Sequence, residues 1–145
     1  MKYAVICFTE RGAWVCRRLF HKLKETGEEC EAIIPKRFLR EEWKKEGLKE
    51  REEEFLSQWT GKMFAEKRAM IFVSATGIAV RAIAPWIRDK MTDPPVVTVD
   101  EGAQFVIPLL SGHVGGANEL ARHIADWLEA VPVITTATDV NGSLR

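Results

Sequence analysis

One stretch decides the fold: Phe105-Val-Ile-Pro-Leu-Leu110, continued by Ser111-Gly-His-Val-Gly-Gly-Ala-Asn118. The first part is an apolar run typical of a strand, and apolar residues at helical spacing cover residues 115–130. The order strand, glycine-rich loop and helix is therefore predicted. Such a loop directs backbone N–H groups and the positive end of the following helix toward a bound anion.

Outward from this stretch, strand-like and helix-like segments alternate along the chain. Apolar runs typical of buried strands cover residues 3–8, 30–34, 69–73, 95–99 and 131–134. Helical spacing covers residues 12–26 and 78–88, where Pro85 is expected to kink the helix, and Pro108 suits an edge or irregular position. The alternation predicts an α/β fold: a three-layer single domain over residues 1–145, with a mainly parallel sheet and helices on both faces.

Composition argues against several classes of protein. Lysine plus arginine equals aspartate plus glutamate at 21 each, so no net charge steers the chain toward nucleic acid. No apolar run reaches membrane-spanning length and no signal peptide is visible, so no membrane partner is expected. Cys7, Cys16 and Cys30 lack paired spacing, which favours a reduced, cytoplasmic protein. Residues 40–54 are mostly charged and are interpreted as a solvated helix or mobile surface segment without a catalytic role.

Polar residues follow four of the predicted strands. In a parallel sheet, ligands bind outside the carboxyl ends of the strands, so these clusters are expected to line one edge together. The clusters are Ser74/Thr76/Gly77, Asp100/Glu101, Ser111/Gly112/His113 with Gly115/Gly116, and Thr135/Thr136/Thr138/Asp139. Their convergence is a stronger signal than any one cluster.

Each cluster also has a simpler interpretation. Ser74 and Thr76 fit a cap on the helix near residue 77 as well as they fit a ligand contact. Asp100 directly ends an apolar strand and is the better acid–base candidate of its pair, although residues 100–102 also fit a plain turn. Residues 135–139 fit a hydroxyl-rich turn equally well. Arg81 lies one turn into its helix, and either reaches an anion at the helix N-terminus or is an ordinary surface arginine.

His113 stands apart from the other histidines. It lies in a glycine-rich loop before a helix start, which leaves it little apolar surface to pack against, so a functional role is favoured. His123 falls on the helix face opposite Leu120 and Ile124 and is expected in solvent. His21 sits among basic residues without a partner motif.

Several familiar motifs are missing from the sequence. No Walker A pattern occurs, and Gly-x-Gly-x-x-Gly does not follow the first strand, so a nucleotide is not indicated. There is no Gly-x-Ser-x-Gly nucleophile elbow and no ligand spacing for structural zinc. Neither a nucleotide nor a structural metal site is therefore predicted.

A longer series of motifs resembles one known family. It comprises Ser74-Ala-Thr-Gly-Ile-Ala-Val-Arg81, Ala84-Pro85, Asp89-Lys90, Thr92-Asp-Pro94, Val99-Asp-Glu101, Leu109-Leu-Ser-Gly-His-Val-Gly-Gly-Ala-Asn118 and Val133-Ile-Thr-Thr-Ala-Thr-Asp139. In this order the motifs closely resemble the CbiG family of cobalamin biosynthesis, the cobalt-precorrin 5A hydrolases. The resemblance is tight over residues 69–141, whereas residues 1–34 match only in pattern.

The resemblance implies a hydrolase of the anaerobic route to the corrin ring. Such an enzyme opens the ring-A lactone of cobalt-precorrin 5A, releases the two-carbon unit at C20 as acetaldehyde and leaves cobalt-precorrin 5B. Cobalt enters as part of the substrate and the macrocycle acts as the electron sink, so no separate cofactor is implied. The expected partners are this tetrapyrrole and either a carboxy-terminal domain or other enzymes of the pathway.

The residue chemistry fits the implied reaction. Lactone opening needs a base for water and donors for the developing oxyanion. His113 or Asp100 is expected as the base, with the Ser111 hydroxyl or loop N–H groups at the oxyanion. Residues expected to bind the substrate and its carboxylates are Ser74, Thr76, Gly77, Arg81, Gly112, Gly115, Gly116, Asn118, Thr135, Thr136 and Asp139.

Family members usually continue past residues 138–142 into a further carboxy-terminal domain, whereas this chain stops at Arg145. If that domain completes the site, this chain binds substrate without turning it over. Two alternatives to the hydrolase therefore stay open. One is a non-catalytic tetrapyrrole-binding domain that needs a partner domain for turnover, and the other is a generic anion-binding α/β module with another substrate.

Overall fold

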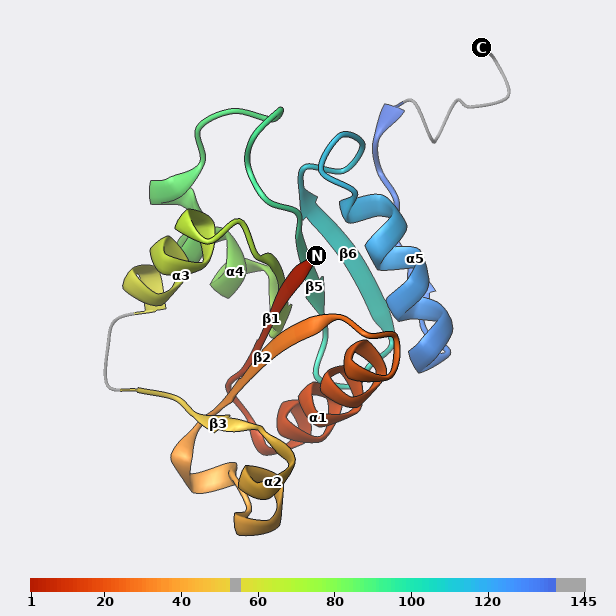
Figure 1. The fold of residues 1–145 in the computed structure, drawn as a ribbon. Helices are drawn as coiled ribbons and strands as arrows, with labels where there is room; N and C mark the ends of the chain where they lie inside the picture. The colour runs from red at the N-terminus through yellow and green to blue at the C-terminus, as the bar shows by residue number, and fades with distance from the viewer. Residues whose placement is uncertain (53–55, 138–145) are drawn as a thin grey trace.

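A sheet of seven strands runs through the part of the chain that the computed structural model describes, residues 1–52 and 56–137 (Figure 1). The spatial order is β3-β2-β1-β4-β5-β6-β7. The strands are β1 Lys2–Cys7, β2 Glu29–Ile34, β3 Lys49–Glu50, β4 Ala69–Val73, β5 Val96–Val99, β6 Phe105–Leu110 and β7 Val131–Pro132. The helices are α1 Glu10–Glu25, α2 Glu41–Glu46, α3 Leu56–Ala65, α4 Thr76–Ile83 and α5 Ala117–Leu128, with 3₁₀ turns η1 Lys36–Phe38 and η2 Ala84–Trp86.

The first five strands along the chain are parallel, and the last two run the other way. β5 pairs with β6 antiparallel, whereas β6 and β7 are parallel to each other. Only residues 100–104 join β5 to β6, and so short a link permits a hairpin but not a parallel crossover, which needs a dozen or more residues. The mainly parallel sheet is confirmed. The reversal places the carboxyl ends of β6 and β7 at the opposite edge from those of β1 to β5 (Figure 1).

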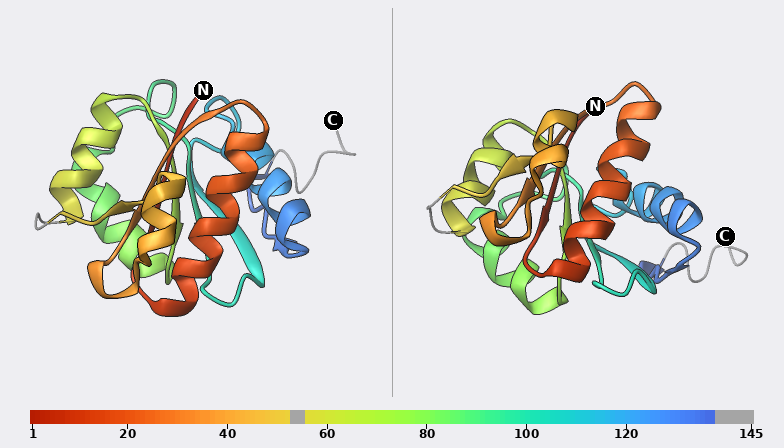
Figure 2. Two further views of the ribbon diagram at one scale, coloured as in Figure 1. Left: turned by 60° about the horizontal axis from the view of Figure 1, so that its bottom comes forward. Right: turned by 90° about the horizontal axis from the view of Figure 1, so that it is seen from below.

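Helices cover both faces of the sheet, which confirms the three-layer prediction (Figure 2). α1 and α5 pack on one face, where Leu19 and Ile124 share a core cluster with Ile71 of β4. α3 and α4 pack on the other face, where Trp59 contacts Phe72 edge to face. Ile71 and Phe72 point to opposite layers because successive side chains of a strand alternate between its two faces.

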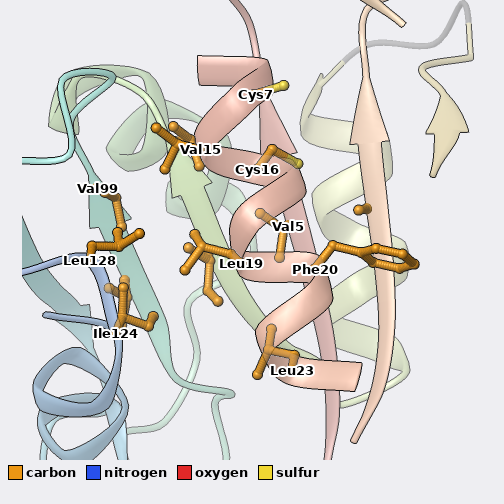
Figure 3. Packing of buried hydrophobic residues seen from close by; sticks show 14 of the residues in the cluster. Val5, Cys7, Val15, Cys16, Leu19, Phe20, Leu23, Val99, Ile124 and Leu128 are labelled. Carbon is orange, nitrogen blue, oxygen red and sulfur yellow. The ribbon is translucent and has the colours of Figure 1, made fainter. Parts of the chain in front are cut away.

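The core between the sheet, α1 and α5 consists of closely packed apolar side chains (Figure 3). Val5, Leu19, Phe20 and Ile124 are each at most 1% exposed. Truncating a buried leucine such as Leu19 to alanine costs about 2–5 kcal/mol of stability. This packing makes the sheet a firm support for the loops at both of its ends.

The charged segment at residues 40–54 contributes to the core, contrary to the expectation of a purely solvated segment. Its described part forms α2 and the edge strand β3, and it buries Trp43 and Leu48 to 3% and 2% exposure. These two apolar side chains dock the segment, while the charged residues around them face solvent. The part at residues 53–54 lies outside the described residues.

Two prolines set local geometry. α4 ends at Ile83, and Pro85 lies in η2. The prediction of a kinked helix that continues to residue 88 was therefore wrong. The helix stops here because proline has no N–H to donate and its ring clashes with the preceding turn. Pro108 pairs with Val97 beside a register shift, which confirms its irregular position.

One carboxylate ties α2 to α1. Glu46 accepts hydrogen bonds from Nε and Nη2 of Arg17 at 2.8 and 2.9 Å, and Nε2 of His21 lies 2.7 Å from Oε1 of Glu46. The hydrogen bond from Arg17, helped by that from His21, lowers the pKa of Glu46 to about 2. His21 therefore has a partner, which the local sequence did not reveal because the two residues are 25 positions apart.

Among the described helices, none is long and apolar enough to cross a membrane. All three cysteines are free thiols, with Cys7 and Cys16 buried, and burial raises the pKa of Cys30 to about 12.

Candidate functional site

The four polar clusters do not share one edge of the sheet, so that prediction was wrong. The clusters after β4 and β5 lie at one end, whereas the clusters after β6 and β7 lie at the other (Figure 1). The reason is the hairpin between β5 and β6, which reverses the chain direction. His113 and Asp100, the two expected bases, are consequently at opposite ends and cannot act on one reacting centre.

Residues 111–118, here called the glycine loop, connect β6 to α5 through a tightly folded backbone. Ser111 has a φ of +60° and Gly116, the N-cap of α5, has a φ of +88°. A Cβ atom at Gly115 would lie 2.4 Å from Cβ of Ser111, so only glycine fits there. The loop therefore needs its glycines for close approach as well as for a left-handed turn.

Part of the expected N–H array is already used inside the glycine loop. The N–H of Ala117 donates to the carbonyl of Ser111 and the N–H of Asn118 donates to the carbonyl of Gly112, both at 3.0 Å. These bonds hold the loop closed against the first turn of α5. An anion at this helix start therefore cannot use the N–H groups of Ala117 and Asn118.

Ser111 fixes the glycine loop to the segment before β5. Its hydroxyl donates to the backbone carbonyl of Asp93 at 2.8 Å, and both residues are buried. The Asp93 carboxylate in turn accepts from the N–H groups of Arg88 and Asp89 at 2.9 and 3.2 Å. The hydrogen of Ser111 is thus engaged in positioning the loop. Asp93 had been given no role from the sequence, although it lies within one of the quoted motifs.

The segment after β7 is joined to the same loop. Asn118, 3% exposed, donates from Nδ2 to Oγ1 of Thr136 at 3.1 Å. Thr136 is half-buried and Thr135 is exposed. The clusters after β6 and β7 therefore meet as predicted, while Thr138 and Asp139 lie outside the described residues.

The outer side of the glycine loop carries His113, whose side chain is exposed beside the exposed Val114. Backbone hydrogen bonds from Ala117 and Asn118 to Ser111 and Gly112 join the loop on the two sides of this histidine. His113 thus lies exposed at the end of the sheet where the glycine loop is held.

A cavity of about 290 Å³ begins at Gly116 and extends along α5. Glu119, His123 and Trp127 line it, together with Tyr3 of β1. His123 is exposed as expected, and its Nε2 lies 3.5 Å from Oε1 of Glu119. The sequence analysis missed this cavity, although a spacing of four residues between its α5 side chains was a signal for a shared stripe.

At the other end of the sheet, neither Ser74 nor Thr76 caps α4. The N-cap is Ala75, without a side-chain hydrogen bond, and the buried Ser74 donates its hydroxyl to the carbonyl of Ala75 at 2.9 Å. Arg81 is exposed, and its Nη1 would lie 3.7 Å from a Cβ atom at Gly77. The guanidinium thus reaches back to the helix start, as the ligand-contact interpretation of Arg81 requires.

Asp100 organises the turn between β5 and β6. Its Oδ1 accepts from the N–H groups of Gln104 and Phe105 at 2.8 and 2.6 Å, and its Oδ2 accepts from Gly102 at 3.2 Å. Asp100, like Glu101, is therefore interpreted as part of the turn. These three hydrogen bonds give the Asp100 carboxylate a structural role in the turn.

Comparisons with known proteins agree with these motifs. The family described as Cobalamin synthesis G N-terminal matches residues 58–139. A cobalt-precorrin-5A hydrolase from Salmonella typhimurium is 45% identical over 138 residues, covering 95% of this chain and 36% of that protein. Another, from Priestia megaterium, is 49% identical over 82 residues, covering 57% of this chain and 22% of that protein. The chain therefore spans about a third or less of the length of these relatives.

A solved structure supports the fold. The crystal structure of a cobalamin biosynthesis protein G homologue from Sulfolobus solfataricus matches with a TM-score of 0.65. The match covers 99% of this chain and 40% of that one, at 24% sequence identity. The arrangement of strands and helices is thus shared with that protein.

Proposed function

The chain belongs to the Cobalamin synthesis G N-terminal family, and on that premise we propose that it is the amino-terminal part of a cobalt-precorrin 5A hydrolase. The proposed reaction opens the ring-A lactone of the cobalt-bound tetrapyrrole and releases acetaldehyde. Cobalt belongs to the substrate in this proposal. The 45% identity to the Salmonella typhimurium hydrolase across almost the whole chain supports it.

The observation that carries the proposal for the site is the fixed glycine loop with an exposed histidine. His113 accepts the proton from water as the oxygen adds to the lactone carbonyl. The bond from the carbonyl carbon to the ring oxygen then breaks as the imidazolium returns the proton to that oxygen. This leaves a hydroxyl on C20, a carboxylic acid that loses its proton to solvent, and a neutral His113 for the second step. Loop N–H groups at Gly115 and Gly116 stabilise the oxyanion of the tetrahedral intermediate.

The second step uses the same histidine in our proposal. His113 removes the proton from the C20 hydroxyl, the bond from C20 to the macrocycle breaks, and the carbonyl of acetaldehyde forms. The macrocycle takes the electron pair and is protonated by the imidazolium, so the proton count balances. Asn118, Gly112, Thr135 and Thr136 position the substrate at this end of the sheet.

Ser111 and Asp100 have other roles in this proposal. Ser111 positions the glycine loop, because its hydroxyl hydrogen is engaged by Asp93. Asp100 keeps the β5–β6 turn in shape. Ser74, Thr76, Gly77 and Arg81 are assigned to a separate anion contact at the other end of the sheet.

The test is acetaldehyde release from cobalt-precorrin 5A. The chain is joined to the remaining length of the Salmonella typhimurium hydrolase and compared with that remaining length alone. We expect release only from the joined protein. An inactive but folded joined protein, beside an active Salmonella enzyme, would contradict the proposal.

A second candidate, a tetrapyrrole-binding domain without turnover of its own, is favoured by the chain's coverage of only 36% of the Salmonella relative. A measurement on the isolated chain distinguishes the hydrolase from the binding domain. Acetaldehyde release by the isolated chain rejects this candidate, whereas substrate binding without release supports it.

A further inference from the structure

A cavity of about 300 Å³ lies at the carboxyl ends of β1 and β2, away from the glycine loop. It forms between the first turn of α1 and the segment from η1 to α2. Its lining residues are Glu10, Trp14, Arg37, Phe38, Leu39, Arg40 and Trp43. We call it the Trp14–Arg40 cavity. Its walls combine aromatic rings with two guanidinium groups.

The arginines of this cavity are stacked on its rings. Cζ of Arg40 lies 4.8 Å from the ring centroid of Trp14 and 5.5 Å from that of Trp43. Cζ of Arg37 lies 4.8 Å from the centroid of Phe38. Stacking on a ring face restricts a guanidinium to a plane and leaves its N–H edge free to donate to a carboxylate in bidentate fashion.

The Glu10 carboxylate lines the same cavity, so two guanidinium groups and one carboxylate face it. Arg17, on the same helix as Trp14, is paired with Glu46. In contrast, no carboxylate among residues 1–52 and 56–137 forms an ion pair with Arg37 or Arg40. A stacked guanidinium without a described counter-ion, beside a ring that is 43% exposed at Trp14, is suited to an anionic ligand.

We propose that the Trp14–Arg40 cavity binds a carboxylate carried on a flat unsaturated ring. Arg37 and Arg40 hold the carboxylate, and the exposed part of Trp14 packs against the ring. This inference rests on the proposed function, from which the ligand class is taken to be the carboxylated rim of a tetrapyrrole. A cavity of about 300 Å³ accommodates one ring and its acid arm, so the rest of the macrocycle projects into solvent.

This site is separate from the glycine loop. β1 has six residues and a strand rises about 3.3 Å per residue, so the two sites lie about 20 Å apart along the sheet. A tetrapyrrole in the Trp14–Arg40 cavity is therefore not in contact with His113. The cavity is a second binding site, and its substitution is expected to leave the chemistry at the glycine loop in place.

The experiment titrates the isolated chain with three probes and follows tryptophan fluorescence. Uroporphyrin is a flat tetrapyrrole with a carboxylated rim, mellitate is a single carboxylated ring, and pyrophosphate is an anion without a ring. We expect uroporphyrin and mellitate to bind and pyrophosphate to bind at least tenfold more weakly. Equal affinity for pyrophosphate would overturn ring recognition.

Variants locate the binding. Arg37→Gln and Arg40→Gln should each weaken uroporphyrin binding about tenfold or more, because each removes a charge-assisted hydrogen bond. Arg18→Gln removes an exposed charge from α1, the helix that carries Trp14, outside the cavity and should change nothing. Arg40→Lys keeps the charge but loses the planar guanidinium, and it should weaken uroporphyrin binding several-fold. This variant provides the test if Arg40→Gln does not fold.

The outcomes separate this proposal from the proposed function. Loss of one uroporphyrin site in Arg37→Gln and Arg40→Lys, with that site kept in His113→Ala, supports the second site. Binding unchanged in both arginine variants overturns it, as does no binding of any probe. Acetaldehyde release by the joined protein decides the proposed function independently, since His113 is not part of this cavity.

Discussion

At the glycine-loop end of the sheet, backbone hydrogen bonds and small residues hold the polar groups, whereas at the Trp14–Arg40 end, aromatic rings hold charged side chains. The first end is built from neighbours in sequence, residues 111–118, together with residues 93 and 136. The second joins α1 to residues 37–43. The family match at residues 58–139 includes the first end and stops short of the second. A site formed by the backbone of consecutive residues can be recognised as a sequence motif, whereas a site formed by stacking between distant segments cannot.

The largest expected effect would come from His113, the group that the glycine loop presents. His113→Ala in the joined hydrolase should lower kcat for acetaldehyde release about 100- to 10,000-fold, the usual contribution of a general base. His113→Gln should be nearly as poor, because an amide does not titrate near neutral pH.

His123→Ala is the control for this measurement, since His123 is exposed on α5 and is not in the loop. Full activity in His113→Ala would remove histidine from the chemistry. A raised KM with unchanged kcat would instead make His113 a binding group.

Gly115→Ala tests whether the loop end depends on backbone close approach. The added methyl group would meet Cβ of Ser111 at 2.4 Å and its carbonyl oxygen at 3.0 Å. We expect a loss of about 1–3 kcal/mol in the free energy of unfolding, measured by urea denaturation. Gly116→Asn is the control, because asparagine tolerates a positive φ and the space around Gly116 is open. Equal losses in both variants would mean that crowding is not the cause.

Ser111→Ala probes the link between the loop and residues 88–94. Removing the hydroxyl that donates to the Asp93 carbonyl should lower the free energy of unfolding by about 1 kcal/mol. The loss should reach about 3 kcal/mol if no water replaces the lost donor at that carbonyl. Thermal unfolding measures the loss, and Thr135→Ala, at an exposed position, should stay within about 0.5 kcal/mol of the native protein. An unchanged melting temperature in Ser111→Ala would show that the loop is held without this bond.

The smallest effect is expected at the opposite end, where Glu46 ties α2 to α1. Folding lowers the pKa of Glu46 from 4.5 to about 2, so the folded protein binds fewer protons between these values. Its contribution to stability is therefore present above about pH 4.5 and lost as the pH falls to about 2. Melting temperatures from pH 5 to 2 should fall more steeply for the native protein than for Glu46→Gln. Parallel curves would contradict the assignment.

Much of the fold was readable because strands and helices carry their own periodicity. The polar-edge prediction failed because it assumed one direction for all strands, although the link at residues 100–104 was too short for a crossover. Asp100 looked like an acid–base group because a single sequence does not show three backbone amides meeting one carboxylate. Of the four clusters expected at one edge, only those after β6 and β7 meet, because these two strands run in the same direction.

The Trp14–Arg40 cavity escaped notice for a different reason. Trp43 lies in a run dominated by charge, and its burial depends on α1, a distant segment. Arginine–aromatic stacking has no fixed spacing in sequence, so no sequence motif identifies it.

The strands at the two margins of the sheet are unusually brief. β3 and β7 contain two residues each within the described part of the chain, and β7 ends with Pro132, which has no N–H to donate. Long unpaired margins invite another chain to add a strand, and short, charged or proline-bearing margins discourage it. β3 and β7 themselves therefore offer another chain little main chain to pair with. Pairing at these two short strands is not expected to hold a larger assembly together.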